Sequence, residues 1–449
     1  MLDIQFIRDN AELVAEKAKQ KGYKVDIPKI LELDKQRKSK LLEIEAQRSV
    51  SKAYAKQGKP DESHIAVARE LRQKIKNLEV ELGPIEEEFI GLLKAVPNMS
   101  LDDVPVGESE GDNQVAKKVG ELPKFDFEPK THWQIAEERG LIDKERAARV
   151  AGSRFAYIKG DLVKLQFAII QFVLAELTNE ETIKKIIQVN RIEGISSAPF
   201  IPVLPPYMIR TEVYDAMDRL EPRDERYRVG ADKDDIWLQG SAEHTLGPMH
   251  MGERFSWTEL PIRYLGYATS FRREAGTYGK DTEGIIRMHQ FDKLEMESFT
   301  HPEFGLKEHL LFIAIQEYLM EQLGLPYQVI QKCTADIGKP NARGIDIEVW
   351  LPGQNKYVET HTADYMTDYQ ARRLGTKVGQ KPQAFDSRSG AAEFNTNSPP
   401  GLEFVHTNDA TAFALGRTMV AVIENYQQVD GKVQIPSALR PYMGGQANI

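Results

Sequence analysis

Residues 271–295 read FRREAGTYGKDTEGIIRMHQFDKLE, and they combine the apolar spacing of β-strands with many charged side chains of both signs. Successive side chains of a strand point to opposite faces of a sheet. If the two arms pair through the loop 275–284, Met288 and Leu294 point into the core. The opposite face then collects two guanidiniums, two carboxylates and an aromatic ring, from Arg272, Glu274, Arg287, Phe291 and Glu295.

This charged face suits a ligand that bears phosphates, a flat ring and an amine. The alternative is cross-strand ion pairing on a solvated sheet surface, which is common. The chain has no G-x-x-x-x-G-K-[ST] loop and no G-x-G-x-x-G that opens a helix. If the protein binds ATP, arginines must therefore hold the phosphates.

Two further segments support a phosphate site. KYVETHTADYMTDYQARR, residues 356–373, places Glu359 and Thr362 at a predicted strand end, where they suit a Mg²⁺ ion that bridges phosphates. FVHTNDATAFALGRTMVAVIENYQ, residues 404–427, is predicted to run from a turn into a helix, with Arg417 two turns in. A buried arginine needs an anionic partner, which is either a ligand or a nearby glutamate.

The whole chain has the composition of a soluble globular protein of two or three domains: 449 residues, 41% apolar and 28% charged. Its single cysteine, Cys333, excludes a disulfide framework and a four-cysteine zinc site. The first ten residues lack the pattern of a signal peptide, and the longest apolar run, 165–177, is too short to span a bilayer. We expect a cytoplasmic protein with no membrane association.

Residues 28–94 are predicted to form two long antiparallel helices joined by KQGKPD, an arm of roughly 45 Å. The second helix carries a heptad seam of Leu71, Ile75, Leu78, Leu82, Ile85, Phe89 and Leu92. Between Lys29 and Lys76 there are 13 Lys or Arg against 7 Asp or Glu, although the net charge of the chain is −9. This local excess indicates contact with a polyanion; a solvated helix surface and a dimerisation coiled coil are the alternatives.

The acidic, turn-rich segment 100–114 predicts a domain boundary near residue 112. Beyond it, helices are expected at about 161–178, 211–220, 303–323 and 411–427, among short strands. Because strands and helices do not alternate regularly, we predict an α+β fold with a mostly antiparallel sheet flanked by helices. Residues 379–401 are poor in apolar side chains and are predicted to form a mobile loop.

Residues 271–295 resemble motif 2 of class II aminoacyl-tRNA synthetases, in the form found in bacterial seryl-tRNA synthetases. The resemblance covers nearly the whole chain, because further segments follow in the family order: MLDIQFIRDN, VPNMSLDDVPVG, FDFEPKTHW, PVLPPYMIR (motif 1), EVWLPGQNKYVE, DYQARR, and ALGRTMVAVIENYQ with IPSALRPYMGG (motif 3). It implies a tRNA-binding domain at 1–112 and a class II catalytic domain at 113–449, in a homodimer. The basic arm would hold the long variable arm of serine tRNA by shape.

The resemblance also implies ATP-dependent ligation of L-serine to serine tRNA through a seryl-adenylate, with Mg²⁺ as cofactor; selenocysteine tRNA stays open as a second acceptor. Arg272 and Arg417 would be the catalytic residues. The ATP-binding set would be Arg272, Arg273, Glu274, Arg287, Met288, Phe291, Glu359, Thr360, His361, Thr362 and Arg417. Serine would be bound by Ser241, Ala242, Glu243, Arg272, Glu295, Asp409 and Thr411. The metal ligands would be Glu359 and Thr362.

Three positions depart from the family pattern. Ser241 stands in GSAEH where the family usually has Thr, and ETHTADY replaces the commoner E-[IL]-S-S-C-S-N. Asp409 and Ala410 stand where Asn and Gly are frequent, beside the expected serine pocket. Because discrimination among small amino acids depends on paired polar contacts, the additional carboxylate of Asp409 bears directly on serine specificity.

Two other functions compete with serine–tRNA ligation. A paralogue that passes a small amino acid to another acceptor would not need the basic arm. A non-catalytic tRNA-binding relative would be expected to lose Arg272, Glu274, Phe291 or Arg417, and all four are present. The residues therefore favour an active tRNA ligase.

Overall fold

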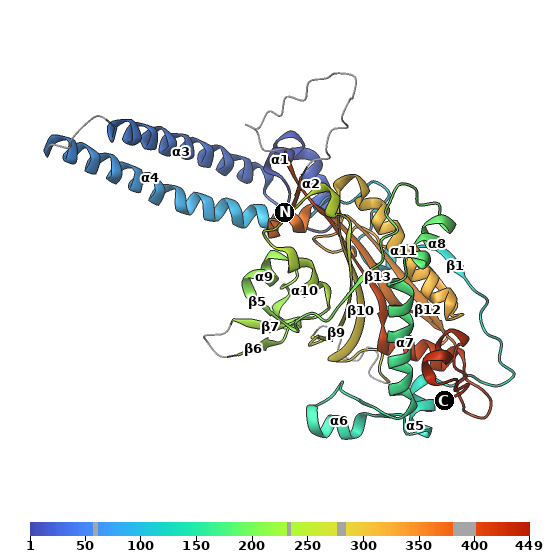
Figure 1. The fold of residues 1–449 in the computed structure, drawn as a ribbon. Helices are drawn as coiled ribbons and strands as arrows, with labels where there is room; N and C mark the ends of the chain where they lie inside the picture. The colour runs from blue at the N-terminus through green and yellow to red at the C-terminus, as the bar shows by residue number, and fades with distance from the viewer. Residues whose placement is uncertain (57–61, 231–234, 276–283, 380–400) are drawn as a thin grey trace, which may run out of the picture. The chain divides into compact units, whose positions relative to one another are not determined.

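The protein folds into two compact units, Met1–Met99 and Ser100–Ile449 (Figure 1). Its computed structural model describes residues 1–56, 62–230, 235–275, 284–379 and 401–449. The division between the two units, after Met99, comes earlier in the sequence than the predicted boundary near residue 112. The reason is that the acidic segment packs on the second unit: the Leu101 amide donates to Ala342 O at 2.9 Å and the Gly107 amide to Thr334 Oγ1 at 3.2 Å.

The first unit holds two short helices, α1 (Ile4–Asp9) and α2 (Ala11–Gln20), and two long ones, α3 (Ile27–Tyr54) and α4 (Glu62–Ala95). The α3 helix starts at Asp26, whose side chain accepts the Lys29 amide hydrogen, with Pro28 in the first turn. The α3 and α4 helices lie side by side as the predicted hairpin arm (Figure 1). Its turn, residues 57–61, lies outside the described residues.

Interhelical ion pairs accompany the apolar seam of the arm. Arg37 lies 3.0 Å from Glu86, Lys40 2.6 Å from Glu81, and Arg48 2.7 Å from Glu79. These pairs use the acidic stretch of α4 to neutralise part of the basic surface of α3. Pro84 lies inside α4, and the helix continues through it although its ring nitrogen donates no hydrogen bond.

The second unit is built on an eight-stranded sheet with the order β1-β11-β12-β13-β16-β10-β9-β4. Every pair of neighbours is antiparallel except β4 and β9, which run parallel. In that order the strands are Gln114–Val119, Tyr327–Gln331, Arg343–Leu351, Lys356–Thr367, His406–Ala414, Gln290–Thr300, Ile262–Phe271 and Ile201–Val203. The predicted α+β class, with a mostly antiparallel sheet, is confirmed.

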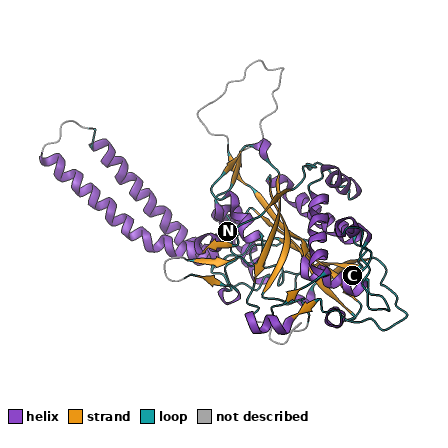
Figure 2. Cartoon of the chain, turned by 60° about the horizontal axis from the view of Figure 1, so that its bottom comes forward, coloured by secondary structure: helices purple, strands orange, loops and turns teal. Residues whose placement is uncertain are grey.

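One face of this sheet is covered by α7 (Asp161–Leu177), α8 (Glu180–Val189), α11 (Gly305–Gln322) and α13 (Leu415–Asn425) (Figures 1 and 2). Their apolar residues and those of the strands form one large core. The other face meets smaller elements: α9 (Thr211–Ala216), α10 (Glu243–Leu246), α12 (Tyr369–Leu374) and a three-stranded sheet of β5 (Met208–Arg210), β6 (Arg228–Val229) and β7 (Ile236–Leu238). This second face is the one left open for polar chemistry.

The remaining elements lie at the edges of the second unit. They are the helices α5 (His132–Glu138) and α6 (Lys144–Ala151), the paired strands β2 (Ile142–Asp143) and β3 (Tyr157–Ile158), and a third small sheet of β8 (Arg254–Phe255), β14 (Lys377–Gly379) and β15 (Leu402–Phe404). Residues 380–400, most of the segment predicted to be a mobile loop, lie outside the described residues. In the part of the chain that the structure describes, no helix is long and apolar enough to cross a membrane.

Two predicted helix boundaries were wrong, and two apolar residues of 271–295 lie outside the strands. The predicted helix at 411–427 is a strand up to Ala414 and a helix only over Leu415–Asn425, because residues 406–414 pair with β10 and β13 in the middle of the sheet. The helix predicted at 211–220 ends at Ala216. Ile285 and Ile286 are buried but lie in the connection between β9 and β10, not in a strand.

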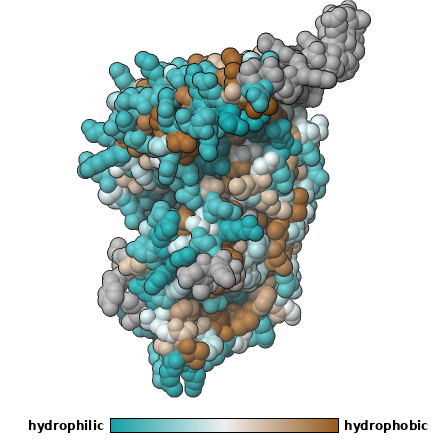
Figure 3. All heavy atoms as spheres, turned by 90° about the vertical axis from the view of Figure 1, so that its left-hand side faces the viewer, coloured by the Kyte–Doolittle hydropathy of each residue, from teal (hydrophilic) through white to brown (hydrophobic). Residues whose placement is uncertain are grey.

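The surface of the molecule has no single apolar face in the view of Figure 3, where hydrophobic side chains form small separate patches among hydrophilic ones. On the arm, exposed apolar residues such as Leu42, Val50 and Val80 are interspersed with charged ones. Scattered apolar side chains of this kind are normal for a soluble surface.

The buried ion pair between Arg263 and Glu308 gives a stability test. Both side chains are at most 1% exposed; Arg263 donates to both Glu308 carboxylate oxygens, at 2.8 and 2.6 Å, and to two backbone carbonyls. Glu308→Ala leaves the guanidinium buried without its anion, and we expect the free energy of unfolding to fall by about 3–5 kcal/mol in urea titrations. Glu181→Ala, which breaks an exposed pair with Lys184, serves as the control and should change it little.

Candidate active site

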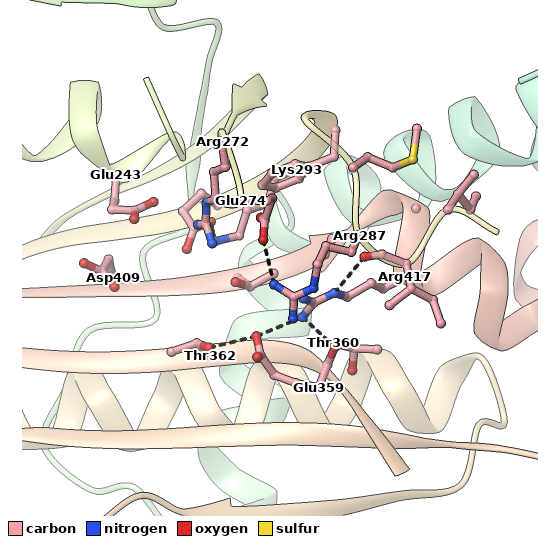
Figure 4. A pocket seen from close by; sticks show the side chains of 18 of the residues that line it. Glu243, Arg272, Glu274, Arg287, Lys293, Glu359, Thr360, Thr362, Asp409 and Arg417 are labelled. Atoms are coloured by element: carbon pink, nitrogen blue, oxygen red, sulfur yellow. Dashed lines mark hydrogen bonds and ion pairs between the residues drawn. The ribbon is translucent and has the colours of Figure 1, made fainter. Parts of the chain in front are cut away.

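A pocket of about 300 Å³ lies on the open face of the large sheet, over β10, β13 and β16 (Figure 4). Its wall is dominated by charged and hydroxyl side chains. The lining residues are Arg219, Glu243, Arg272, Glu274, Ile285, Ile286, Arg287, Met288, Phe291, Lys293, Glu295, Glu359, Thr360, Thr362, Asp364, Asp409, Thr411, Ala414, Gly416 and Arg417. The five residues that strand alternation groups on one face of 271–295 all line it.

At one end of the pocket the geometry fits a flat ring between charges. The Arg272 guanidinium lies 5.4 Å from the centre of the Phe291 ring and donates to Gly240 O at 2.9 Å. Glu274 pairs with Arg287 at 2.7 Å (Figure 4). The backbone of Glu274 has a φ of 53°, in the left-handed region that is uncommon for non-glycine residues and is enriched at ligand sites.

The segment that carries Arg287 is anchored by His132, from the FDFEPKTHW stretch. His132 Nδ1 contacts Glu424 Oε1 at 2.9 Å, and its Nε2 accepts the Ile285 amide hydrogen at 3.3 Å. Glu424 therefore selects the tautomer with the proton on Nδ1. Gly284 is required here because a Cβ would meet His132 Nε2 at 1.8 Å, and because its φ is +65°.

A second cation, Arg417 at the start of α13, defines the next part of the pocket. Its Nη1 lies 3.0 Å from Glu359 Oε1 and donates to Glu359 O at 2.7 Å. Thr362 Oγ1 lies 3.4 Å from the same carboxylate oxygen. The Glu359 side chain is 46% exposed; the walls of the pocket desolvate it in part, which raises its pKa, but the charges of Arg417 and Lys332 outweigh that effect and hold the pKa at about 2. The carboxylate is therefore ionised throughout the physiological range.

Glu359 and Thr362 share a face because β13 is irregular between them. The pairing with β12 shifts there: Ile347 is opposite His361, and Glu348 is opposite Glu359. Thr360 is the additional residue of this bulge, so residues 359 and 362, which simple alternation would place on opposite faces, both point into the pocket. The two residues lie within a strand and not at its end.

The other end of the pocket is rich in buried carboxylates. Lys293 lies 2.5 Å from Glu295 and donates to Ser241 Oγ at 3.1 Å. Glu243 is 8% exposed, and its Oε2 has no hydrogen-bond partner among the described residues. This end can bind an ammonium group through Glu243 and a hydroxyl through Glu295.

Asp409 lies at the bottom of this acidic end and is paired with Arg219 at 3.1 Å. Burial raises the pKa of Asp409 to about 7; the charges of Asp364 and Glu243 act in the same direction, and Arg219 opposes them. Asp409 lines the acidic end of the pocket and is paired with Arg219, a cation whose position the sequence did not indicate.

Most of the predicted site residues line this one pocket, and four do not. Arg273 lies over Tyr227, with its guanidinium carbon 5.7 Å from the ring centre. Ser241 and Ala242 are fully buried beside the pocket, where Ser241 contacts Lys293. The ring of His361 packs against Phe413, because the bulge turns it to the core side of β13.

Sequence reasoning missed Arg219, Lys293 and Asp364 as pocket residues. Strand alternation was a sufficient signal for two of them, since Lys293 lies between Phe291 and Glu295 on one face and Asp364 follows Thr362 by two residues. Arg219 follows α9 in an irregular segment, and no periodicity indicates where its side chain points.

Comparison with known proteins supports the same interpretation. Residues 1–100 match the family model of the seryl-tRNA synthetase N-terminal domain, and residues 227–426 match the tRNA synthetase class II core domain (G, H, P, S and T). The serine–tRNA ligase of Citrifermentans bemidjiense is 38% identical, with 100% of both chains covered; that of Geotalea uraniireducens is 38% identical, with 99% of each covered. The chain belongs to the seryl-tRNA synthetase family.

Solved structures of this family share the fold over the full length. The seryl-tRNA synthetase of Pyrococcus horikoshii complexed with ATP is 33% identical, with a TM-score of 0.84 and coverage of 100% of this chain and 99% of that chain. The cytoplasmic serine–tRNA ligase of Naegleria fowleri in complex with AMP is 28% identical, with a TM-score of 0.81 and coverage of 100% and 98%. The family resemblance inferred from the sequence is thus confirmed.

The pKa of Asp409 makes stability depend on pH. In the unfolded chain this carboxyl loses its proton near pH 4, whereas in the folded protein it keeps the proton up to about pH 7. Between these values the folded state binds more protons, so the free energy of unfolding falls as the pH rises. From pH 6 to pH 8, ligand-free wild type should lose about 1 kcal/mol more than Asp409→Asn in urea titrations. Parallel pH curves for the two proteins would contradict this assignment.

Proposed function

We propose that the protein activates L-serine with ATP and transfers it to serine tRNA. The observation that carries this proposal is a single pocket in which guanidiniums, an aromatic ring and buried carboxylates meet, in a chain that matches serine–tRNA ligases over its full length. In this proposal the charged face of 271–295 binds the phosphates and adenine ring of ATP and the amine of serine.

ATP would lie along the end of the pocket formed by Phe291 and the arginines. The Phe291 ring stacks on adenine, and the Glu274 carboxylate accepts from its amino group. Arg272 then lies at the α-phosphate, while Arg287 and Arg417 hold the outer phosphates. This use of Arg287 and Arg417 requires their present partners, Glu274 and Glu359, to share or release them when ATP binds.

The donor set beside Arg417 fits Mg²⁺. Among the described residues there is no group of three His, Cys, Asp or Glu side chains that forms a complete metal site. Mg²⁺ commonly binds through one or two protein oxygens together with substrate phosphates and water. The ionised carboxylate of Glu359 and the hydroxyl of Thr362 supply such oxygens. When bound, the ion would neutralise phosphate charge; Glu359 and Thr362 would hold it.

Serine would lie at the acidic end of the pocket. Glu243 and Glu295 accept from its ammonium and hydroxyl groups, and Thr411 adds a hydroxyl beside them. A carboxylate oxygen of serine attacks the α-phosphorus; the new P–O bond forms as the bond to pyrophosphate breaks, and the seryl-adenylate remains. The 2′- or 3′-hydroxyl of the terminal ribose of tRNA then attacks the carbonyl, and AMP leaves. The protein supplies position and positive charge, not a covalent nucleophile.

The hairpin arm of α3 and α4 would bind the tRNA. Exposed basic residues remain on both helices after the interhelical ion pairs are formed, among them Lys35, Lys38, Arg72, Lys74 and Lys76. Lys and Arg on a helical surface suit phosphate and sugar contacts that read RNA by shape. This supports the assignment of the first unit as the tRNA-binding domain and of the second as the catalytic domain.

We further propose a homodimer that works in the cytoplasm. The strand β4 is an edge of the large sheet; the exposed apolar residue Ile201 lies in it, and Leu204, also exposed, directly follows it. An edge strand with exposed apolar side chains is suited to pairing with a second chain. The free, buried Cys333 agrees with a reducing compartment, where ATP and tRNA are also available.

Amino-acid-dependent exchange of pyrophosphate into ATP tests the activation step. We expect exchange with serine in the wild type and a loss of at least 100-fold in Arg272→Ala, because the charge opposite the α-phosphate is removed. Arg273→Ala is the matched control, since its guanidinium lies outside the pocket, over Tyr227. An intact enzyme that exchanges with alanine or threonine but not with serine would refute the substrate.

Removal of the arm tests the division of labour between the units. With residues 40–72 replaced by a short Gly-Ser linker, we expect serine-dependent exchange to persist, because the pocket is built entirely from the second unit. Charging of serine tRNA should be lost. Charging that survives the deletion would show that the arm does not hold the tRNA.

A further inference from the structure

Three buried carboxylates form a row across β10, β16 and β13, and two of them, Asp409 and Asp364, line the acidic end of the pocket. Glu297 on β10 is directly opposite Asp409 on β16, and Asp409 is directly opposite Asp364 on β13. We call these three residues the carboxylate row. All are buried, at 0%, 5% and 6% exposure respectively. Like charges at opposed positions destabilise a sheet, so this arrangement needs compensation.

The compensation within the protein is incomplete. Arg219 contacts two members of the row, Asp409 at 3.1 Å and Asp364 at 3.9 Å. Both carboxylate oxygens of Glu297 and Oδ1 of Asp364 have no hydrogen-bond partner among the described residues, and neither has Oε2 of Glu243. A buried acceptor left without a hydrogen-bond donor destabilises the protein.

A charge count gives the same result. The acidic end holds five carboxyl groups, from the row and from Glu243 and Glu295, against two cations, Arg219 and Lys293. The excess is three, and the single ammonium of serine offsets one. Burial and the neighbouring carboxylates raise the pKa of Asp409 to about 7 and raise that of Glu297 well above its usual range. Asp409 and Glu297 therefore keep their protons to a higher pH than ordinary carboxyl groups, because too few cations lie beside them.

A ligand that brings a second N–H donor would supply what the row lacks. We propose that the amino-acid subsite also activates amino acids that carry a second amine on the side chain, with Asp409 and Asp364 as its acceptors and Arg219 as the residue that positions both. This inference deepens the proposed function and rests on it. The covalent step is the same: the carboxylate oxygen bonds to the α-phosphorus as pyrophosphate leaves.

Other side chains fit the row less well. An anionic side chain would meet like charge, because the contacts of Arg219 with the row are already made to two carboxylates. An apolar side chain would leave the buried acceptors unpaired, and sites built to hydrogen-bond a substrate reject analogues that lack the partner group. Serine offers a single hydroxyl, which Glu295 can bind without the row.

The test is pyrophosphate exchange with 2,3-diaminopropionate, in which an amine replaces the hydroxyl of serine, beside serine and alanine. In the wild type we expect kcat/KM for diaminopropionate to be within about tenfold of the serine value and at least 100-fold above the alanine value. Asp409→Asn and Asp364→Asn should each lower the ratio of diaminopropionate to serine by about 10–100-fold, as expected for loss of a hydrogen bond to a charged group.

Asp346→Asn is the control, since Asp346 is a buried carboxylate on β12 of the same sheet that does not line the pocket. It should leave the ratio unchanged. If the enzyme exchanges with serine but diaminopropionate stays at the alanine level, this inference is wrong and the proposed function stands. The same holds if the ratio of diaminopropionate to serine is unchanged in both row variants. Exchange with diaminopropionate but not serine would refute the serine assignment and retain the row. Absence of exchange with every amino acid would refute both.

Discussion

The register of β10 between β9 and β16 is the constraint on which the rest of the second unit depends. Leu294 and Met296 on this strand are fully buried in the core under α11 and α13, while Phe291, Lys293 and Glu295 face the pocket. A slip of one residue would exchange the two sets and bury the charges in the apolar core. The same alternation that makes the core therefore places the ring, the amine and the carboxylate of the site on one surface.

Irregularities in the neighbouring strands adapt this regular surface to a ligand. A register shift between Leu294 and Glu295 opposite β16, and another in β13 at Thr360, change which side chains reach the pocket. Without the second one, Glu359 and Thr362 would point to opposite faces. Bulges of this kind commonly re-aim side chains beside functional sites. The pocket is thus the product of two rules, alternation along β10 and its local interruption in the adjacent strands.

The sequence was sufficient for the arm and for the strand face that carries Phe291 and Glu295, because each depends on a period that the residues carry: 3.5 for the seam, 2 for the strand. Arg272, Glu274 and Arg287 also line the pocket, but from the connection between β9 and β10, where no strand period applies. The sequence failed where pairing in three dimensions decides. Residues 411–414 have apolar and hydroxyl side chains that suit either a helix or a buried strand, and their place between β10 and β13 selects the strand. The side chain of His361 was expected at ATP, but the bulge that brings Glu359 into the pocket turns His361 to the core.

Asp409 shows how an unusual residue in a sequence acquires its meaning from the structure. In the sequence it stands alone, a carboxylate where the family frequently has Asn. In the structure it lies between Glu297 and Asp364 and is paired with Arg219, which approaches from the segment after α9. A single buried carboxylate without a cation would be expensive, and the pairing lowers that cost. Arg219 and Asp409 thus form one hydrogen-bonded unit, and through Asp364 and Glu297 this unit extends across three strands at the end of the pocket where the amino acid is expected.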